Sequence, residues 1–244
     1  TLATKVGFNV ARWYKIKTIE DLLKYSKILN YRGILKTNSL GYDGKGQFLI
    51  NSKKEINEIW RSINFTDCIL EEKIDFRREI SILYGRSANK TDCFFPISQN
   101  FHEKGILKKT IAPAPINEEK LIDLKNLVKK FSNVLNLVGL LTVELFELSD
   151  GTLIFNEIAP RPHNSFHWSI EGCDNSQFEI LVRCLCGLKI KDTKNNGKWE
   201  MYNLIGNEIN DLKNLIDDQK YSYHIYGKKV VKKGRKMGHF TKRS

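Results

Sequence analysis

The stretch LLTVELFELSDGTLIFNEIAPRPHNS, residues 140–165, carries the most informative pattern of the sequence. Two runs rich in β-forming residues flank Asp150-Gly151, a strong signal for a two-residue hairpin turn. Such a turn places Glu144 directly opposite Glu157 on one face, with Cβ atoms about 5 Å apart. Two carboxylates this close repel each other without a partner. The pattern therefore predicts a cation site, typically Mg²⁺ shared with phosphates, unless one Glu is solvated or paired with Lys.

The loop that follows the second run concentrates polar side chains. Pro160 and Pro162 exclude a regular helix and hold the chain extended. Arg161, His163 and Asn164 lie between and after them, so their polar groups can converge on an anion. A loop histidine is often only a surface residue, but this density of polar types favours a site.

Upstream, helix and strand patterns are mixed. Thr18 followed by Asp21 resembles a capping box that opens an amphipathic helix. A second helix is indicated by apolar residues three or four positions apart: Leu121, Leu124, Val128, Phe131, Leu135 and Val138. Strands are expected at 33–36, 48–50, 68–72, 79–84, 140–148 and 152–158. The mixture indicates an α/β or α+β fold.

Near the start of the chain, Lys36 ends an expected strand and a glycine-rich loop, GYDGKGQ at 41–47, follows it. Glycines let backbone N–H groups approach phosphates closely, and lysines add charge. The Lys-Ser/Thr pair of a Walker A loop is missing. Alone, the segment fits a phosphate-binding loop and an ordinary glycine turn equally well.

Composition narrows the class of protein. The net charge is +12, but the 40 basic residues comprise 30 Lys and 10 Arg beside 21 Asn, which indicates a biased composition more than a nucleic-acid surface. A basic nucleic-acid-binding module stays the alternative from another class. No apolar run is long enough to span a membrane. Five cysteines without a CxxC pair argue against a disulfide framework or zinc site and suit a reducing cytosol. We expect a cytoplasmic globular protein without nucleic-acid or membrane partners.

Six segments in order resemble the N5-carboxyaminoimidazole ribonucleotide synthetase family of ATP-grasp enzymes. They are GYDGKGQ (41–47), EEKIDFRREIS (71–81), NEIAPRPHNS (156–165), SQFE (176–179), YGK (226–228) and GRKMGH (234–239). The likeness covers residues 1 to 241. Phe166 departs from it, because the family usually has Gly there. The family also has an N-terminal Rossmann-like domain, and this sequence opens where that domain ends, so we expect a fragment or split polypeptide.

The resemblance implies an α+β, ATP-grasp fold, in which two α+β subdomains grip ATP. A lid subdomain would occupy residues 1–68, a core subdomain 69–190, and a small β-rich unit that binds substrate phosphate 199–244. The polar stretch KDTKNNGK at 191–198 is typical of a linker. A homodimer is implied for the full-length family.

The resemblance also implies a ligase that uses ATP, Mg²⁺ and bicarbonate to carboxylate 5-aminoimidazole ribonucleotide through carboxyphosphate, in de novo purine synthesis. Another ATP-grasp carboxylase or ligase with a different acceptor would share the nucleotide and magnesium motifs. The segments YGK and GRKMGH favour the ribonucleotide as acceptor.

Residue roles follow by matching position. ATP would be bound by Lys36, Gly41, Tyr42, Asp43, Gly44, Lys45, Gly46, Gln47, Glu71, Ile74, Glu79, His102 and Asn156, with Glu71 and Ile74 along the adenine edge and Glu79 on the ribose hydroxyls. Glu144 and Glu157 would bind magnesium. Arg161, His163 and Asn164 would hold bicarbonate and then carboxyphosphate. The ribonucleotide would contact Tyr42, Asp43, Lys228 and Arg235.

Overall fold

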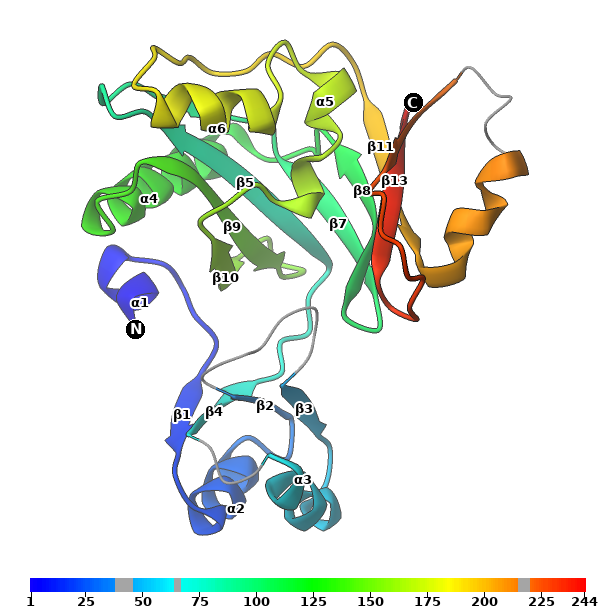
Figure 1. Cartoon of the computed structure of the whole chain (residues 1–244). Coiled ribbons are helices and arrows are strands. Elements are labelled where there is room, and N and C mark those ends of the chain that lie inside the picture. Colours follow the sequence, from blue (N-terminus) through cyan, green and yellow to red (C-terminus); the bar gives the residue numbers. More distant parts are fainter. Residues whose placement is uncertain (38–45, 64–66, 215–219) are drawn as a thin grey trace. The chain divides into compact units, whose positions relative to one another are not determined.

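The computed structural model describes residues 1–37, 46–63, 67–214 and 220–244 (Figure 1). The chain divides into two compact units. The larger consists of Thr1–Asn9, Phe76–Glu103 and Leu107–Ser244, and the smaller of Val10–Asp75 with Lys104–Ile106. In these described ranges no helix is both long and apolar enough to cross a membrane.

The smaller unit is an antiparallel sheet with helices packed on it. Its strand order is β1-β4-β2-β3. The strands are β1 (Trp13–Ile16), β2 (Gly33–Thr37), β3 (Gln47–Ile50) and β4 (Cys68–Glu72), and the helices are α2 (Ile19–Ile28), η1 (Lys53–Glu55) and α3 (Ile56–Ser62). Leu22 of α2 and Ile56 of α3 join Leu35 and Leu70 of the sheet in one core cluster.

Helix α2 begins as the sequence predicted. The Thr18 side chain accepts a hydrogen bond from the Asp21 N–H at 3.2 Å, and the Asp21 carboxylate accepts one from the Thr18 N–H at 3.2 Å. This reciprocal pair satisfies two backbone donors that a helix start leaves without partners, so the capping box is confirmed with Asp in place of Glu.

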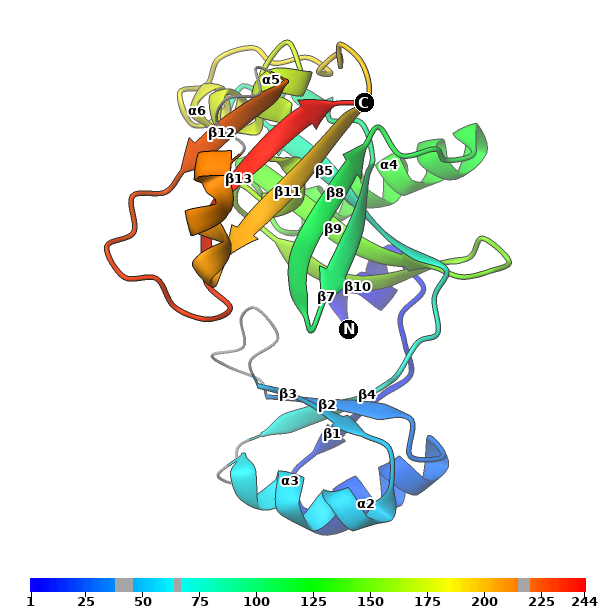
Figure 2. The same ribbon diagram turned by 90° about the vertical axis from the view of Figure 1, so that its right-hand side faces the viewer.

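The larger unit is built on a nine-stranded sheet of order β10-β9-β5-β7-β8-β11-β13-β12, with β6 pairing to β5. The strands are β5 (Arg78–Arg86), β6 (Asp92–Phe94), β7 (Ser98–Glu103), β8 (Ile106–Ala112), β9 (Gly139–Glu147), β10 (Leu153–Ala159), β11 (Trp199–Ile205), β12 (Tyr221–Ile225) and β13 (Lys236–Arg243). Figure 2 shows β8, β11, β13 and β12 side by side. The helices are α1 (Leu2–Val6), α4 (Glu118–Val134), η2 (Asn164–Phe166), α5 (Ser169–Gly172), α6 (Gln177–Leu185) and η3 (Gly206–Asn214).

The strands of the C-terminal segment do not form a sheet of their own. Strand β11 pairs with β8 at one side and with β13 at the other, so residues after 199 extend the large sheet. The smaller unit runs on to Asp75, beyond the lid boundary expected at residue 68. The subdomain boundaries expected from the sequence stay a prediction beside this division.

Helices α6 and α4 cover opposite faces of the large sheet (Figure 1). Side chains alternate along β5, so Leu83 and Tyr84 point to opposite faces. Helix α6 covers the face of Leu83, where Ile180 joins the core cluster. Gly85 permits this approach, because a Cβ there would lie 2.8 Å from Ile180 Cγ2. On the other face Phe131 of α4 packs 5.9 Å from the ring of Phe155 on β10.

Helix α4 ends earlier than its apolar stripe predicted. Leu124 and Phe131 are buried as expected, but the helix ends at Val134. Asn136 then takes φ 49°, a left-handed conformation that terminates helical hydrogen bonding. Val138, which the stripe included, is consequently 45% exposed, so this part of the prediction was wrong.

Candidate functional site

The central hairpin pairs Glu144 with Glu157, as the sequence predicted, but reaches this pairing by a different route. The turn has three residues rather than two, because the Leu148 N–H donates to the Thr152 carbonyl at 2.9 Å. Gly151 takes φ 79°, the left-handed position that closes such a turn. This turn alone would bring residue 156 opposite Glu144. A β-bulge between Phe155 and Glu157 shifts the register by one and restores the pair.

The bulge also decides which way the neighbouring side chains point. Phe155 pairs with Leu145 and Glu157 with Glu144, so two residues that would share a face in a regular strand point to opposite faces. The ring of Phe155 packs against that of Phe8, with ring centres 5.3 Å apart, on the face that α4 covers. Glu157 faces the other side with Glu144. Asn156, expected at the nucleotide, is the extra residue of the bulge.

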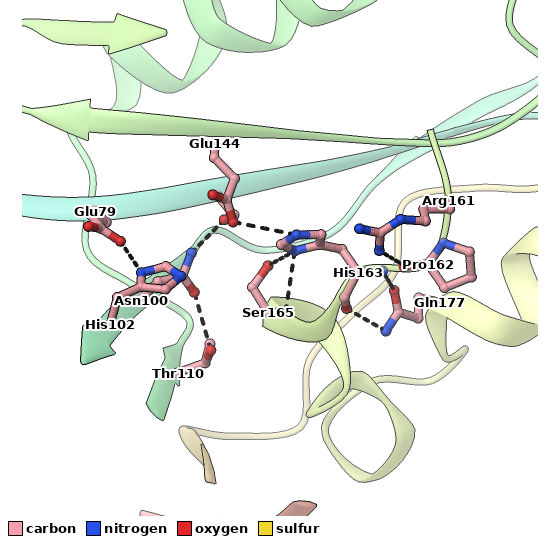
Figure 3. A network of polar contacts seen from close by, with 11 residues as sticks. Glu79, Asn100, His102, Thr110, Glu144, Arg161, Pro162, His163, Ser165 and Gln177 are labelled. Atoms are coloured by element: carbon pink, nitrogen blue, oxygen red, sulfur yellow. Dashed lines mark hydrogen bonds and ion pairs between the residues drawn. The ribbon is translucent and has the colours of Figure 1, made fainter. Parts of the chain in front are cut away.

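Glu144 occupies a strained electrostatic position. The residue is 9% exposed, and burial followed by the nearby charge of Glu157 raises the pKa of its carboxyl to about 7. Its Oε1 lies 3.5 Å from Nε2 of His163, as Figure 3 shows. A buried carboxylate with a second one beside it favours a bound cation or a proton.

The adjacent strands bring two predicted nucleotide residues together. His102 of β7 pairs with Glu79 of β5 through its Nδ1 atom (Figure 3). Burial lowers the pKa of His102, but the hydrogen bond and charge of Glu79 outweigh it, and the net shift is upward. Beside them Asn100 donates to Ser81 Oγ at 2.6 Å and accepts from Thr110 at 3.2 Å. These bonds anchor the strands that carry the pair.

The proline-containing loop brings its predicted residues to the same face. His163 is buried, and burial followed by the charge of Arg161 lowers its pKa to about 3. The Arg161 side chain is anchored on the Pro162 carbonyl at 3.0 Å. Both amide atoms of Asn164 are buried without a hydrogen-bond partner among the described residues. An orphaned amide next to a neutral histidine is the pattern that a polar ligand would complete.

In the smaller unit, Lys36 and Glu71 form an ion pair with an N–O distance of 2.5 Å. They lie on neighbouring strands, β2 and β4, so two further predicted nucleotide residues come together there. Ile74 follows β4 and is half-buried. Gly46 and Gln47 are described, whereas Gly41, Tyr42, Asp43, Gly44 and Lys45 lie outside the described residues.

Lys228 and Arg235 lie on the loop between β12 and β13. Lys228 Nζ donates to the Lys236 carbonyl and lies 5.3 Å from the centre of the Tyr226 ring. Arg235 is exposed, and its guanidinium donates to the Val230 carbonyl at 3.2 Å. The same loop therefore carries both residues that were predicted to bind substrate phosphate.

Sequence reasoning missed several residues at this face. Lys236 lies close enough that its charge lowers the pKa of both Glu144 and His163. The rings of His167 and His239 lie with their centres 4.9 Å apart and their planes tilted by 32°. Burial lowers their pKa values to about 4 and about 2. Lys236 and His239 stand in the segment GRKMGH, which was the available signal. His167 directly follows Phe166 in the stretch that resembles the family, but it was assigned no role.

Two carboxylates, those of Glu144 and Glu157, could serve as ligands of a magnesium ion. In the described part of the chain no group of three or more His, Cys, Asp or Glu residues forms a metal cluster. Mg²⁺ is commonly held by one or two carboxylates, with phosphate and water oxygens as the other ligands. Glu144 and Glu157 match that donor set, and a cation between them would offset the repulsion that raises the pKa of Glu144.

Two protein-family models match this chain, each in its own segment, and curated proteins match nearly its whole length. Residues 1–178 match the ATP-grasp domain, and residues 200–244 match the phosphoribosylaminoimidazole carboxylase C-terminal domain. The N5-carboxyaminoimidazole ribonucleotide synthase of Bacillus subtilis is 39% identical over 238 residues, which cover 96% of this chain and 62% of that protein. The bifunctional purine synthesis protein purC/E of Dictyostelium discoideum is 36% identical over 263 residues, 99% of this chain and 26% of that protein.

Solved structures show the same likeness. N5-carboxyaminoimidazole synthetase from Staphylococcus aureus, complexed with ADP, superposes with a TM-score of 0.93 at 37% identity, over 100% of this chain and 65% of that one. The Aspergillus clavatus synthase in complex with ADP and 5-aminoimidazole ribonucleotide gives a TM-score of 0.88 at 26% identity, over 100% of this chain and 66% of that one. This chain thus spans less than two thirds of these relatives. By its matched domain and fold, the chain belongs to the ATP-grasp family, and its relatives from Bacillus subtilis and Staphylococcus aureus are named N5-carboxyaminoimidazole ribonucleotide synthases.

Proposed function

We propose that this chain carries the ATP-grasp and C-terminal parts of an N5-carboxyaminoimidazole ribonucleotide synthase. The reaction would consume ATP and bicarbonate, carboxylate the amine of 5-aminoimidazole ribonucleotide, and release ADP and phosphate. The observation that carries the proposal is the meeting of Glu144, Glu157, His163 and the orphaned amide of Asn164 on one face of the sheet. The named relatives, one of them solved with ADP and the ribonucleotide, supply the substrates.

The chemistry has two steps. A bicarbonate oxygen attacks the γ-phosphorus of ATP, the bond to the β-γ bridging oxygen breaks, and carboxyphosphate and ADP form. Carboxyphosphate then loses its phosphate, and its carboxyl unit, as CO₂, bonds to the substrate amine, which gives up a proton. Arg161 supplies a fixed positive charge, and His163 and Asn164 supply hydrogen-bonding groups toward these anions.

Each unit contains residues that we propose to bind the nucleotide. In the larger unit Glu79, oriented by His102, offers carboxylate oxygens to ribose hydroxyls. In the smaller unit Lys36, held by Glu71, offers an ammonium to phosphate oxygens. Glu144 and Glu157 would hold Mg²⁺, which supplies charge neutralisation to the phosphate oxygens when bound. Residues 41–47, of which 41–45 lie outside the described residues, would bind the phosphates through backbone N–H groups and Lys45.

A direct test follows carbon and phosphate together. The chain is incubated with Mg·ATP, ¹³C-bicarbonate and 5-aminoimidazole ribonucleotide, and ADP is measured beside the labelled carbamate by NMR. We expect equal amounts of the two, dependent on all three substrates, and loss of both in Glu157→Gln. ADP formation without any response to the ribonucleotide would instead assign another acceptor, and binding to RNA or DNA with indifference to ATP would assign a nucleic-acid module.

Two further expectations concern the whole protein, namely a homodimer and a cytoplasmic location. Neither is needed for the residue roles above. Sedimentation velocity of the chain measures the first, and a monomer at micromolar concentration would count against it.

A further inference from the structure

The buried side chain of Gln177 holds the loop that carries His163. Gln177 is the first residue of α6 and is fully buried. Its Oε1 accepts from the His163 backbone N–H at 2.8 Å, and its Nε2 donates to the His163 carbonyl at 2.9 Å. Figure 3 shows this paired contact. Because a backbone N–H only donates and a carbonyl only accepts, the orientation of the amide is determined by its partners.

The same amide determines the protonation of a second ring. Nε2 of Gln177 has two hydrogens, and the second points at Nδ1 of His167, 2.8 Å away. Nδ1 of His167 therefore accepts, and the ring proton of neutral His167 is on Nε2. His167 stacks on Phe178 with ring centres 5.4 Å apart, so it is held by packing as well as by the hydrogen bond.

His163 is oriented from its other side by Ser165. The Ser165 N–H lies 3.4 Å and its hydroxyl oxygen 2.7 Å from Nδ1 of His163. Since the backbone N–H can only donate, Nδ1 is the acceptor and carries no proton. The ring is then neutral with its proton on Nε2, the atom that lies 3.5 Å from Oε1 of Glu144.

From this geometry we infer that Gln177 is a positioning residue, which together with Ser165 presents His163 as a neutral hydrogen-bond donor to the reacting anion rather than as a proton acceptor. The inference rests on the proposed function, because it assigns a role within that same site. Bicarbonate and carboxyphosphate both offer oxygen acceptors to such a donor. A ring that presented a lone pair instead would repel them.

Ring NMR tests the tautomers without relying on activity. In ¹⁵N-histidine-labelled protein, long-range ¹H–¹⁵N spectra report which ring nitrogen carries the proton, and His163→Gln and His167→Gln assign the signals. We expect Nε2–H for both rings. In Gln177→Glu the His167 proton should move to Nδ1, where a carboxylate can accept it, while His163 keeps its tautomer. A proton on Nδ1 of His163 in the unmodified chain overturns the inference.

Kinetics tests the positioning role. Gln177→Glu keeps the acceptor for the His163 N–H but faces the His163 carbonyl with an oxygen, so the loop must move. We expect kcat for bicarbonate-dependent ATP cleavage to fall about a hundredfold, with the KM for ATP changed by less than about twofold. Ser176→Ala is the matched control, because Ser176 caps the same helix by accepting from the Glu179 N–H at 3.2 Å and is not bonded to His163. Equal kcat in the two variants sinks the positioning role.

Failure of the proposed function and failure of this inference give different experimental results. An unmodified chain that never cleaves ATP in a bicarbonate-dependent way defeats the proposed function, and the ring spectra still decide the tautomers. If Gln177→Glu fails to fold, Ser165→Ala takes its place, since it removes only a hydroxyl. That variant keeps the Ser165 backbone N–H, so His163 should keep its proton on Nε2 while the loss of the hydroxyl contact lowers kcat. A proton on Nδ1 of His163 or an unchanged kcat would overturn the inference.

Discussion

Glu144 lies directly opposite Glu157 across β9 and β10, yet of the two only Glu144 is buried. Burial and the charge of its partner both disfavour the ionised form of Glu144. Without a cation the pair therefore costs folding free energy at neutral pH, and with one it supplies two anionic ligands. Stability of the free protein and function of the site oppose each other at this position.

The first prediction separates these two effects. The folded pKa of Glu144 is raised from 4.5 to about 7, so its contribution to stability is full below pH 4.5 and is lost as pH rises to 7. The loss amounts to about 3 kcal/mol at pH 8. Glu144→Gln should therefore raise the free energy of unfolding at pH 8 by about 1–3 kcal/mol, measured by urea titration with a chelator present. The same variant should lose magnesium-dependent turnover. A destabilised variant that still turns over would contradict both halves.

The second prediction concerns acid. Folding lowers the pKa values of three buried histidines, to about 3 for His163, about 4 for His167 and about 2 for His239. The neutral rings therefore contribute to the free energy of unfolding above pH 6.5, and this contribution is lost as pH falls. Glu144 acts in the opposite sense with one proton. Unfolding therefore takes up about two protons between pH 6 and 5. The free energy of unfolding should fall by about 2.7 kcal/mol for each pH unit of acidification in this range.

Urea unfolding at several pH values measures this slope. The variant His239→Leu should reduce it by about one proton, because that ring would no longer take up a proton on unfolding. An unchanged slope in the variant would mean that His239 titrates normally in the folded chain.

The third prediction is that Mg·ATP stabilises the chain by itself. A ligand that binds only the folded state at about 100 times its dissociation constant adds roughly 2.7 kcal/mol. Thermal melting with and without Mg·ATP measures the shift. Lys36→Met should reduce it, while Lys15→Met is the control, since Lys15 is an exposed neighbour on β1 that pairs with Asp67 at 3.5 Å. No shift in a folded sample at saturating nucleotide would remove the nucleotide site from this chain.

The fourth prediction assigns the loop between β12 and β13 to the substrate phosphate. An Arg presents a planar fork of donors to a phosphate, and truncating one partner of a close charge pair costs about 2 to 5 kcal/mol. Arg235→Ala should raise the apparent KM for 5-aminoimidazole ribonucleotide more than about tenfold and leave the KM for ATP nearly unchanged. Lys229→Ala, an exposed change on the same loop, is the matched control. Equal effects of Arg235→Ala on both substrates would make the loop structural.

Local chemistry made part of this structure predictable. The capping box at Thr18 and Asp21 needs only neighbours in sequence, and the structure contains it. The pairing of Glu144 with Glu157 was also predicted, although the three-residue turn and the bulge that produce it were not. The bulge coincides with the packing of Phe155 on Phe8, beyond the hairpin, which turn propensities do not encode.

Other features depended on distant parts of the chain. Gln177 reaches His163 from α6, and His239 reaches His167 from β13, so only the strand order and helix packing bring these residues together. Phe166 departs from the glycine usual in the family. Its side chain is fully buried in the core cluster and packs edge-on against Phe95 with ring centres 6.0 Å apart. The space that accepts it is made by other elements, so no local pattern could reveal it.

The bulge joins two parts of the molecule that serve different purposes. Phe155 and Glu157 are two positions apart on β10, one packed against Phe8 and the other facing Glu144. The Phe155 N–H is also bonded to the Asn9 carbonyl at 2.8 Å, so the segment before the smaller unit holds the strand at the point where it changes face. Natural variation at Phe8 is then constrained twice, by the apolar core it fills and by the carboxylate whose direction that core maintains. Selection for turnover should therefore be visible in the buried aromatic position Phe8.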